Sequence, residues 1–216
     1  MCYNKYSVFK HYTYFVMEIN LKNEITMRIK CSLYKMNNIL KNKGFEITDK
    51  FDLYDLYFVE NNIEVKKENL SKLLSDYILI RNVKQFVAPE YKESYDYIQL
   101  VSKHKHFSSD NTILSQSKST CDIKDEKQGI DFLKSIGYKK IVEIKQKIVE
   151  YKKDELIIET QSAENQYNLI EVETTNSLDT IDKLKQKIKE LELPVYKDNY
   201  FINKEEVELN KIFKGD

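Results

Sequence analysis

Charged side chains recur at every second position along several predicted strands, and they are the residues best placed for chemistry. Glu143, Lys145 and Lys147 alternate with other residues, as do Glu171 and Glu173 further along the chain. Successive side chains of a strand point to opposite faces of the sheet. In a sandwich these residues would form a wet outer surface. In a closed barrel the same alternation can place a charged lining inside, with an apolar outer face under helices.

Histidine and cysteine offer weaker signals. His104 and His106 have the spacing of two metal ligands on one strand face, but no third ligand is evident, which favours a solvent-exposed pair. Cys2, Cys31 and Cys121 are odd in number and have no CxxC spacing. They argue against a secreted disulfide scaffold and favour a reduced, cytoplasmic setting. The chain has no glycine-rich phosphate-binding loop.

The elements that must position these residues follow from hydrophobic periodicity. Period-two alternation over residues 18–31 predicts a first strand, and Ser32 then caps a helix that Gly44 ends. Residues 108–117 are polar and are predicted to form a loop. Further strands are predicted over residues 51–59, 77–83, 97–105, 141–151, 156–160 and 169–174. Further helices are predicted after Asp125, after Ser177 and over residues 203–213.

This order of elements indicates the fold class. Connections between successive strands are too short for repeated parallel crossovers, so the pattern predicts an antiparallel α+β domain. The leading residues 1–16 have no sustained apolar core and no small-residue cleavage site, and they are interpreted as an N-terminal extension rather than a signal peptide.

Composition excludes several classes of protein. The 216 residues carry 35 basic and 35 acidic side chains, which argues against a general nucleic-acid binder while allowing one basic pocket. Hydrophobic residues make up 41% of the chain, enough for a core. The longest apolar runs are far shorter than the roughly 18 residues that cross a bilayer, so no membrane partner is expected.

Six segments in order resemble the CYTH family, also called triphosphate tunnel metalloenzymes, which includes class IV adenylyl cyclases and thiamine triphosphatases. Glu24-Ile-Thr-Met-Arg28 is similar to the family's first strand, and Leu169-Ile-Glu171-Val-Glu173 to its closing strand. The likeness covers roughly residues 17–175. The four segments between them are Phe51-Asp-Leu-Tyr-Asp55-Leu-Tyr57-Phe58, Ile78-Leu-Ile-Arg81, Leu100-Val-Ser-Lys103, and Phe132 to Tyr138 followed by Glu143-Ile-Lys145-Gln-Lys147.

Two registers compete at the first strand. Glu18-Ile-Asn-Leu-Lys22 also resembles the family signature, but Glu24 lies twenty positions before Gly44, which is close to the family's usual interval. We favour the register of Glu24, Thr26 and Arg28. In either register the second acidic residue of the signature is missing, because Thr26 or Asn20 stands there.

The resemblance implies an antiparallel eight-stranded β-barrel, or tunnel, with flanking helices, formed by residues 17–216 as one domain. It implies that the interior binds a triphosphate and Mg²⁺ or Mn²⁺. Metal ligands are then expected at Glu24, Glu171 and Glu173, and catalytic roles at Glu159 and Lys103. The substrate-binding cations are expected to be Arg28, Arg81, Lys103, Lys105, Lys145 and Lys147. Arg28 and Arg81 are the only two arginines in the chain.

Departures from the family pattern keep three functions open. The first strand lacks one acid, and Ser119, Thr120 and Cys121 stand where the family tends to have an acidic strand. The expected function is metal-dependent hydrolysis of a triphosphate. The alternatives are an adenylyl cyclase that makes cyclic AMP from ATP, and a non-catalytic phospho-ligand or nucleotide-binding protein. A small-molecule triphosphate or nucleotide is the expected partner, for a monomer or homodimer in the cytoplasm.

Overall fold

The structure is a computed structural model that describes residues 24–85, 96–107, 113–163, 168–175, 180–197, 200, 202 and 204–214. The proposed extension of residues 1–16 and the alternative register at Glu18, Asn20 and Lys22 lie outside these residues.

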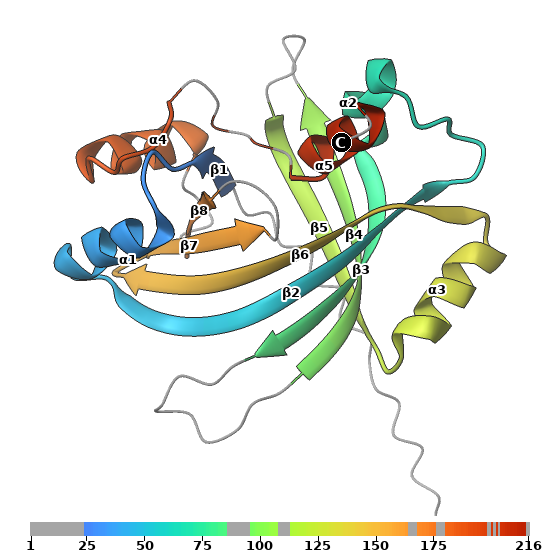
Figure 1. Ribbon diagram of the computed structural model, residues 1–216, viewed down its shortest axis with the longest axis horizontal. Helices are drawn as coiled ribbons and strands as arrows, with labels where there is room; N and C mark the ends of the chain where they lie inside the picture. The colour runs from blue at the N-terminus through green and yellow to red at the C-terminus, as the bar shows by residue number, and fades with distance from the viewer. Residues whose placement is uncertain are drawn as a thin grey trace, which may run out of the picture.

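Eight antiparallel strands form one sheet, which is the number that the family resemblance implies (Figure 1). Their order across the sheet is β1-β8-β7-β6-β2-β3-β4-β5. All neighbouring strands pair antiparallel. The strands are β1 (Glu24–Arg28), β2 (Glu46–Glu60), β3 (Asp76–Gln85), β4 (Asp96–Phe107), β5 (Ile113–Ile123), β6 (Tyr138–Lys153), β7 (Leu156–Ala163) and β8 (Asn168–Thr174).

The sheet curls like a tunnel but does not close. β1 and β5 are its two edges, and within the described residues they share no ladder. Curling nevertheless brings the two halves together, because Lys103 of β4 lies 3.8 Å from Glu24 of β1. The long, paired strands β2 and β6 form the middle of the sheet, and their ladder is interrupted by two register shifts. Such irregularities bend a strand and increase its twist.

Three helices cover the outer, convex face (Figure 1). α1 (Leu33–Asn42) and α4 (Ile181–Glu190) pack on the β1, β8 and β7 side, and α3 (Glu126–Ser135) packs on β3 and β6. Ser32, Asp125 and Thr180 cap the three helices, each accepting a hydrogen bond from a main-chain N–H three residues on. Gly44 and Gly137 follow α1 and α3 with φ of +83° and +89°, a conformation that glycine adopts without strain.

Two helices lie on the inner face instead. The short 3₁₀ turn η1 (Lys67–Asn69) leads into α2 (Leu70–Leu73), and α5 (Lys204–Lys214) ends the described chain. An apolar cluster joins them to the sheet, and Leu209 of α5 is only 2% exposed within it. The cluster's strand residues include Tyr57, Tyr77 and Val101. One part of the interior is therefore an ordinary hydrophobic core.

The segment before α5 lies along the free edge of β1. Thr26 N–H donates to the Tyr200 carbonyl at 3.1 Å, and its own carbonyl accepts from Ile202 N–H at 3.1 Å. Tyr196 N–H donates to the Arg28 carbonyl at 2.9 Å, and Lys30 N–H donates to the Pro194 carbonyl at 2.7 Å. These bonds satisfy main-chain groups that an edge strand otherwise leaves open.

The expected elements are found, with two differences. β5 begins at Ile113, so the predicted loop over residues 108–117 is wrong from residue 113 onward. The pair η1 and α2 was not predicted. Among the described helices, none is both long enough and apolar enough to cross a membrane.

Candidate functional site

An arginine–aspartate pair lies in the sheet interior where β2 and β3 run side by side. Asp55 and Arg81 are register partners, and the guanidinium donates two hydrogen bonds to the carboxylate, at 2.8 and 2.7 Å. Asp55 is only 1% exposed. Burial acts to lower the pKa of Arg81, but the Asp55 charge and hydrogen bonds outweigh it and raise that pKa. Arg81 is thus a fixed, permanently charged group whose position Asp55 sets.

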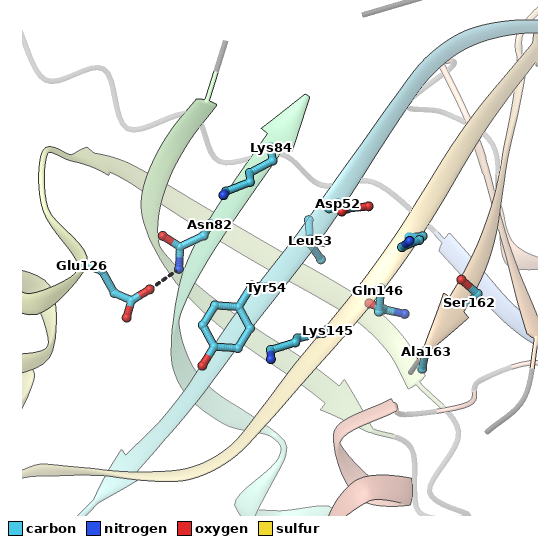
Figure 2. Close-up of a pocket in the computed structure, with 11 residues that line it drawn as sticks. Asp52, Leu53, Tyr54, Asn82, Lys84, Glu126, Lys145, Gln146, Ser162 and Ala163 are labelled. Atoms are coloured by element: carbon cyan, nitrogen blue, oxygen red, sulfur yellow. Dashed lines mark hydrogen bonds between the residues drawn. The ribbon is translucent and has the colours of Figure 1, made fainter. Parts of the chain in front are cut away.

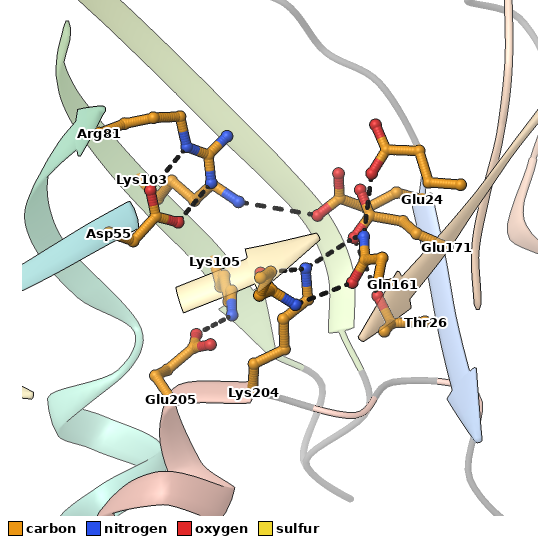
Figure 3. Close-up of polar contacts among 12 residues, drawn as sticks. Glu24, Thr26, Asp55, Arg81, Lys103, Lys105, Gln161, Glu171, Lys204 and Glu205 are labelled. Atoms are coloured by element: carbon orange, nitrogen blue, oxygen red, sulfur yellow. Dashed lines mark hydrogen bonds and ion pairs between the residues drawn. The ribbon is translucent and has the colours of Figure 1, made fainter. Parts of the chain in front are cut away.

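Two lysines of β4 extend this basic side (Figure 3). Lys103 lies 3.8 Å from Glu24, and its side chain is 14% exposed. Lys105 is buried, with its ammonium 2.9 Å from Glu205 of α5 and 5.4 Å from the centre of the Tyr77 ring. Both point inward, because side chains two apart on a strand share a face.

Lys118 of β5 is a third inward-facing lysine, paired in register with Lys103. Burial lowers its pKa to about 8, and the nearby charges of Arg81 and Lys103 act in the same direction. Glu24 and Glu171 oppose the shift without cancelling it. A cation held in this way among other cations would gain stability from a bound anion.

The acidic side comes from β1 and β8. Glu24 is the register partner of Glu173, and Thr26 that of Glu171. The Thr26 hydroxyl donates to the Glu171 carboxylate at 3.4 Å, and Thr26 is 8% exposed. Thr26 therefore occupies the lining position that the resemblance assigns to a metal-binding acid, and it already bonds one of the remaining acids.

A second carboxylate, Glu159 of β7, is the register partner of Glu171. Gln161 joins the two, because its amide nitrogen lies 2.9 Å from Glu159 and 3.3 Å from Glu171. Burial and the charge of Glu171 raise the pKa of Glu159. Burial acts to raise the pKa of Glu171 as well. The charges of Lys204 and Lys103 and the hydrogen bond from Gln161 outweigh burial and lower that pKa to about 2. One proton is therefore held at Glu159 while Glu171 stays ionised.

The first turn of α5 adds one charge of each sign to the interior (Figure 3). The Lys204 ammonium lies 3.4 Å from Glu171 and 3.5 Å from the side-chain oxygen of Gln146. Glu205 pairs with Lys105 and is 4% exposed. Burial acts to raise the pKa of Glu205, but Lys105 outweighs it and lowers that pKa to about 2. Glu205 is therefore ionised at neutral pH.

The structure brings most of the predicted site residues together. Strand alternation and these contacts place Glu24, Arg81, Lys103, Lys105, Glu159 and Glu171 on the inner face. Glu173 lies on that face opposite Glu24 and is partly exposed. Arg28 shares the face by alternation, but it is exposed at the end of β1.

Lys145 and Lys147 do not lie in the interior, and the expectation that they line it is wrong. Both are exposed, and the Lys145 ammonium lies 5.5 Å from the centre of the Tyr54 ring. Tyr54 precedes Asp55 on β2 and so faces outward. The two lysines instead line a pocket of about 580 Å³, together with the outward-facing Tyr54 (Figure 2). On β6 it is the intervening residues, such as Ile144 and Gln146, that are buried.

Five inner residues escaped sequence reasoning. In the sequence Asp55 stands out only as part of a family-like strand, and Lys118 only as the residue before Ser119, Thr120 and Cys121. Gln161, Lys204 and Glu205 carry no signal of their own in the sequence. Period-two alternation puts Lys103 and Lys105 on one face of β4. Lys118 can be assigned to the same face only when the register between β4 and β5 is known.

The oxygen ligands in the interior fit a divalent cation only in part. Among the residues that the structure describes, no group of three or more His, Cys, Asp or Glu side chains could hold a metal ion. Mg²⁺, however, commonly takes one or two carboxylates and completes its shell with phosphate oxygens and water. Glu24 and Glu171, on paired strands, supply oxygens of this kind. They fit a cation that arrives together with a phosphate group.

Known proteins share this fold at low sequence identity. No protein-family model matches the chain, and no curated protein matches it either. The PH1819 protein of Pyrococcus horikoshii aligns with a TM-score of 0.64 at 15% identity, covering 90% of this chain and 99% of that one. A candidate adenylate cyclase of Vibrio parahaemolyticus aligns with a TM-score of 0.59 at 12% identity, covering 89% and 99%.

A third solved structure has a described activity. HpAC1 of Hippeastrum is a candidate adenylyl cyclase whose structure is described as revealing a dominant triphosphatase activity. It aligns with a TM-score of 0.50 at 15% identity, covering 90% of this chain and 96% of that one. At these identities the likenesses show the fold alone, and that fold is consistent with the CYTH-type architecture expected from the sequence.

Proposed function

We propose that the protein binds a triphosphate-containing small molecule inside the curled sheet and hydrolyses it with a divalent metal ion. One observation carries the proposal: cations from three consecutive strands, Arg81, Lys103 and Lys118, face carboxylates from β1 and β8. A triphosphate and a metal ion together need such an arrangement, with one side basic and the other acidic.

The basic side matches the charge of the ligand. A triphosphate carries about four negative charges, and cations from separate strands can contact several of its oxygens at once. Arg81 is held bidentately by Asp55, so it presents a fixed guanidinium edge, whereas the lysines act as point charges. Lys105 belongs to the same face but is engaged by Glu205.

The acidic side would hold the metal ion. Glu24 and Glu171 would bind Mg²⁺ or Mn²⁺, with Glu173 adjacent to Glu24. Such an ion, when bound, neutralises the charge that develops on the phosphate oxygens during transfer to water. Glu159 would hold a proton beside this site at neutral pH, since burial and Glu171 raise its pKa.

A second candidate function is ligand binding without turnover. It is favoured by Thr26, which replaces an acid of the family signature and bonds Glu171 from within the lining. With one ligand fewer on β1, the interior would keep its basic side and lose part of its capacity to hold a metal ion.

Release of products from a panel of triphosphates separates these functions. Tripolyphosphate, thiamine triphosphate and ATP are incubated with Mn²⁺, with Mg²⁺ or with a chelator, and phosphate, pyrophosphate and cyclic AMP are measured. We expect metal-dependent phosphate release that Lys103→Met lowers at least tenfold, the usual scale for loss of a charged contact. Lys147→Met, on the outer face, is the matched control and should retain activity.

Other results would assign a different function. Cyclic AMP with pyrophosphate as the main products would favour a cyclase. Tight binding without turnover, together with turnover gained by Thr26→Glu but not by the uncharged Thr26→Gln, would favour the binding protein. Equal losses in Lys103→Met and Lys147→Met would refute an interior site.

A further inference from the structure

The first turn of α5 occupies the interior at the places where the proposed ligand would bind. Glu205 pairs with Lys105 at 2.9 Å, and both side chains are at most 6% exposed. Lys204 lies 3.4 Å from Glu171, with side chains 17% and 18% exposed. In Figure 3 both residues reach from α5 toward lining residues of β4 and β8.

The two charges match the two parts of a metal–triphosphate ligand. The Glu205 carboxylate presents an anionic oxygen to Lys105, as a phosphate oxygen would. The Lys204 ammonium places a positive charge on Glu171, as a metal ion would. Adjacent residues of one helix thus satisfy both an anion-binding and a cation-binding group of the lining.

The Asp55–Arg81 ion pair, in contrast, joins two strands of the sheet and involves no helix. Asp55 and Arg81 are adjacent across the β2–β3 ladder, and their positions are fixed by main-chain hydrogen bonds. α5 has no such ladder. Of its residues only Glu205 and Leu209 are buried, while Ile212 and Phe213 near its end are 59% and 37% exposed. Few buried contacts indicate a low free energy of local opening.

We propose that the first turn of α5 is an internal competitor of the ligand. Glu205 and Lys204 compensate the lining charges in the free protein, and a metal-bound triphosphate displaces them as it enters. Burying an ion pair costs desolvation free energy, so the paired state is easier to exchange for a ligand than its short contacts suggest. This inference rests on the proposed triphosphate site and adds its regulation by the C-terminal helix.

Titration of three proteins with tripolyphosphate tests the competition. Glu205→Gln keeps the size of the side chain but removes the competing charge, and Glu206→Gln, one residue on, is the matched control. We expect Glu205→Gln to bind tripolyphosphate about fivefold tighter or more, which is the lower end of typical coupling between two sites. Glu206→Gln should bind like the wild type. Unchanged or weaker binding by Glu205→Gln would overturn the proposal.

Hydrogen exchange of the wild-type protein gives a readout that needs no substitution. Adding tripolyphosphate with Mn²⁺ should speed amide exchange in α5 while exchange in α3, on the outer face, stays constant. Binding with unchanged or slower exchange in α5 would overturn the competitor and leave the triphosphate site standing. Absence of binding by both the wild type and Glu205→Gln would overturn both proposals, whereas binding by Glu205→Gln alone would support both.

Discussion

The ionisable residues in the interior differ in the charged groups that surround them. Arg81 and Lys105 each have a close carboxylate, whereas Lys118 is buried near the cations Arg81 and Lys103, whose effect on its pKa Glu24 and Glu171 only oppose. Glu159 and Glu171 are neighbours that share one net charge through Gln161. A like charge beside a buried ionisable group shifts the pKa of that group, and a bound ligand of opposite charge shifts it back. Lys118 and Glu159 are therefore the residues at which pH tests the site.

Lys118 should make ligand binding depend on pH. Its pKa of about 8 means that it is charged at pH 7 and loses its proton as the pH rises above 8. The wild type should bind tripolyphosphate about tenfold tighter than Lys118→Met at pH 7, the scale of one charged hydrogen bond. That advantage should shrink above pH 8. Calorimetry gives the binding constants of both proteins at several pH values, and their ratio at each pH is unaffected by protonation of the ligand itself. A ratio that does not change with pH would contradict the prediction.

The raised pKa of Glu159 should make the free energy of unfolding fall as the pH rises. Because its pKa is raised, the folded protein keeps a proton that the unfolded chain releases above the usual carboxyl range. Stability is therefore lost as the pH increases toward the folded-state pKa. Glu159→Gln mimics the protonated form and should be more stable than the wild type at pH 9 by the order of 1 kcal/mol, or about 2–4 °C.

Thermal denaturation at two pH values checks this prediction. At pH 5 the wild-type residue is already protonated, so the two proteins should melt at nearly the same temperature. A stabilisation of equal size at pH 5 and pH 9 would show that the substitution acts by some means other than the proton.

Single strands show which parts of the site a sequence can predict. Alternation places Lys103 and Lys105 on one face of β4, and the family resemblance adds Glu24 and Glu171 of other strands. The structure places these four side chains on the inner face. In β6 the same reasoning failed, because the inward positions are largely apolar and the charged ones face solvent. Alternation defines two faces but does not say which one is inside, and here the interior contains both polar and apolar zones.

Elements with weak local signals were harder to place. β5 contains three serines within residues 113–123, and its polar composition predicts a loop over part of it, yet it pairs with β4 along its whole length. Serine has little preference for strands, and tertiary pairing overrides that preference. The helix of residues 203–213 was predicted, but its insertion among the lining residues depends on long-range contacts that no local pattern encodes.

The pairing of β2 with β3 should depend on the charge balance of Asp55 and Arg81. Removing either partner leaves a buried charge, so Asp55→Leu and Arg81→Met should each cost about 3–5 kcal/mol of unfolding free energy. The double variant has no buried charge and should cost much less than the sum. Urea denaturation of the four proteins measures the coupling, and additive losses would mean that the pair does not act as a unit.

Across the whole molecule, the C-terminal segment compensates for a sheet that does not close. Four residues of this segment make main-chain hydrogen bonds with β1 and the residues that follow it, and Val195 is only 2% exposed. The four are Pro194, Tyr196, Tyr200 and Ile202. α5 then enters the interior from that edge and satisfies charges on β4 and β8. One stretch of chain thereby covers the open edge and completes the polar lining.

A chain that ends at Leu193 should lose stability and associate. It leaves the outer edge of β1 unpaired, and an open strand edge favours pairing with another copy. A chain that ends at Ile202 keeps those hydrogen bonds and loses only α5, so it is the matched control. Light scattering after gel filtration should show concentration-dependent oligomers for the shorter chain only, and calorimetry should show its lower melting temperature. Oligomers formed equally by both chains would assign the protective role to α5 rather than to the segment along β1.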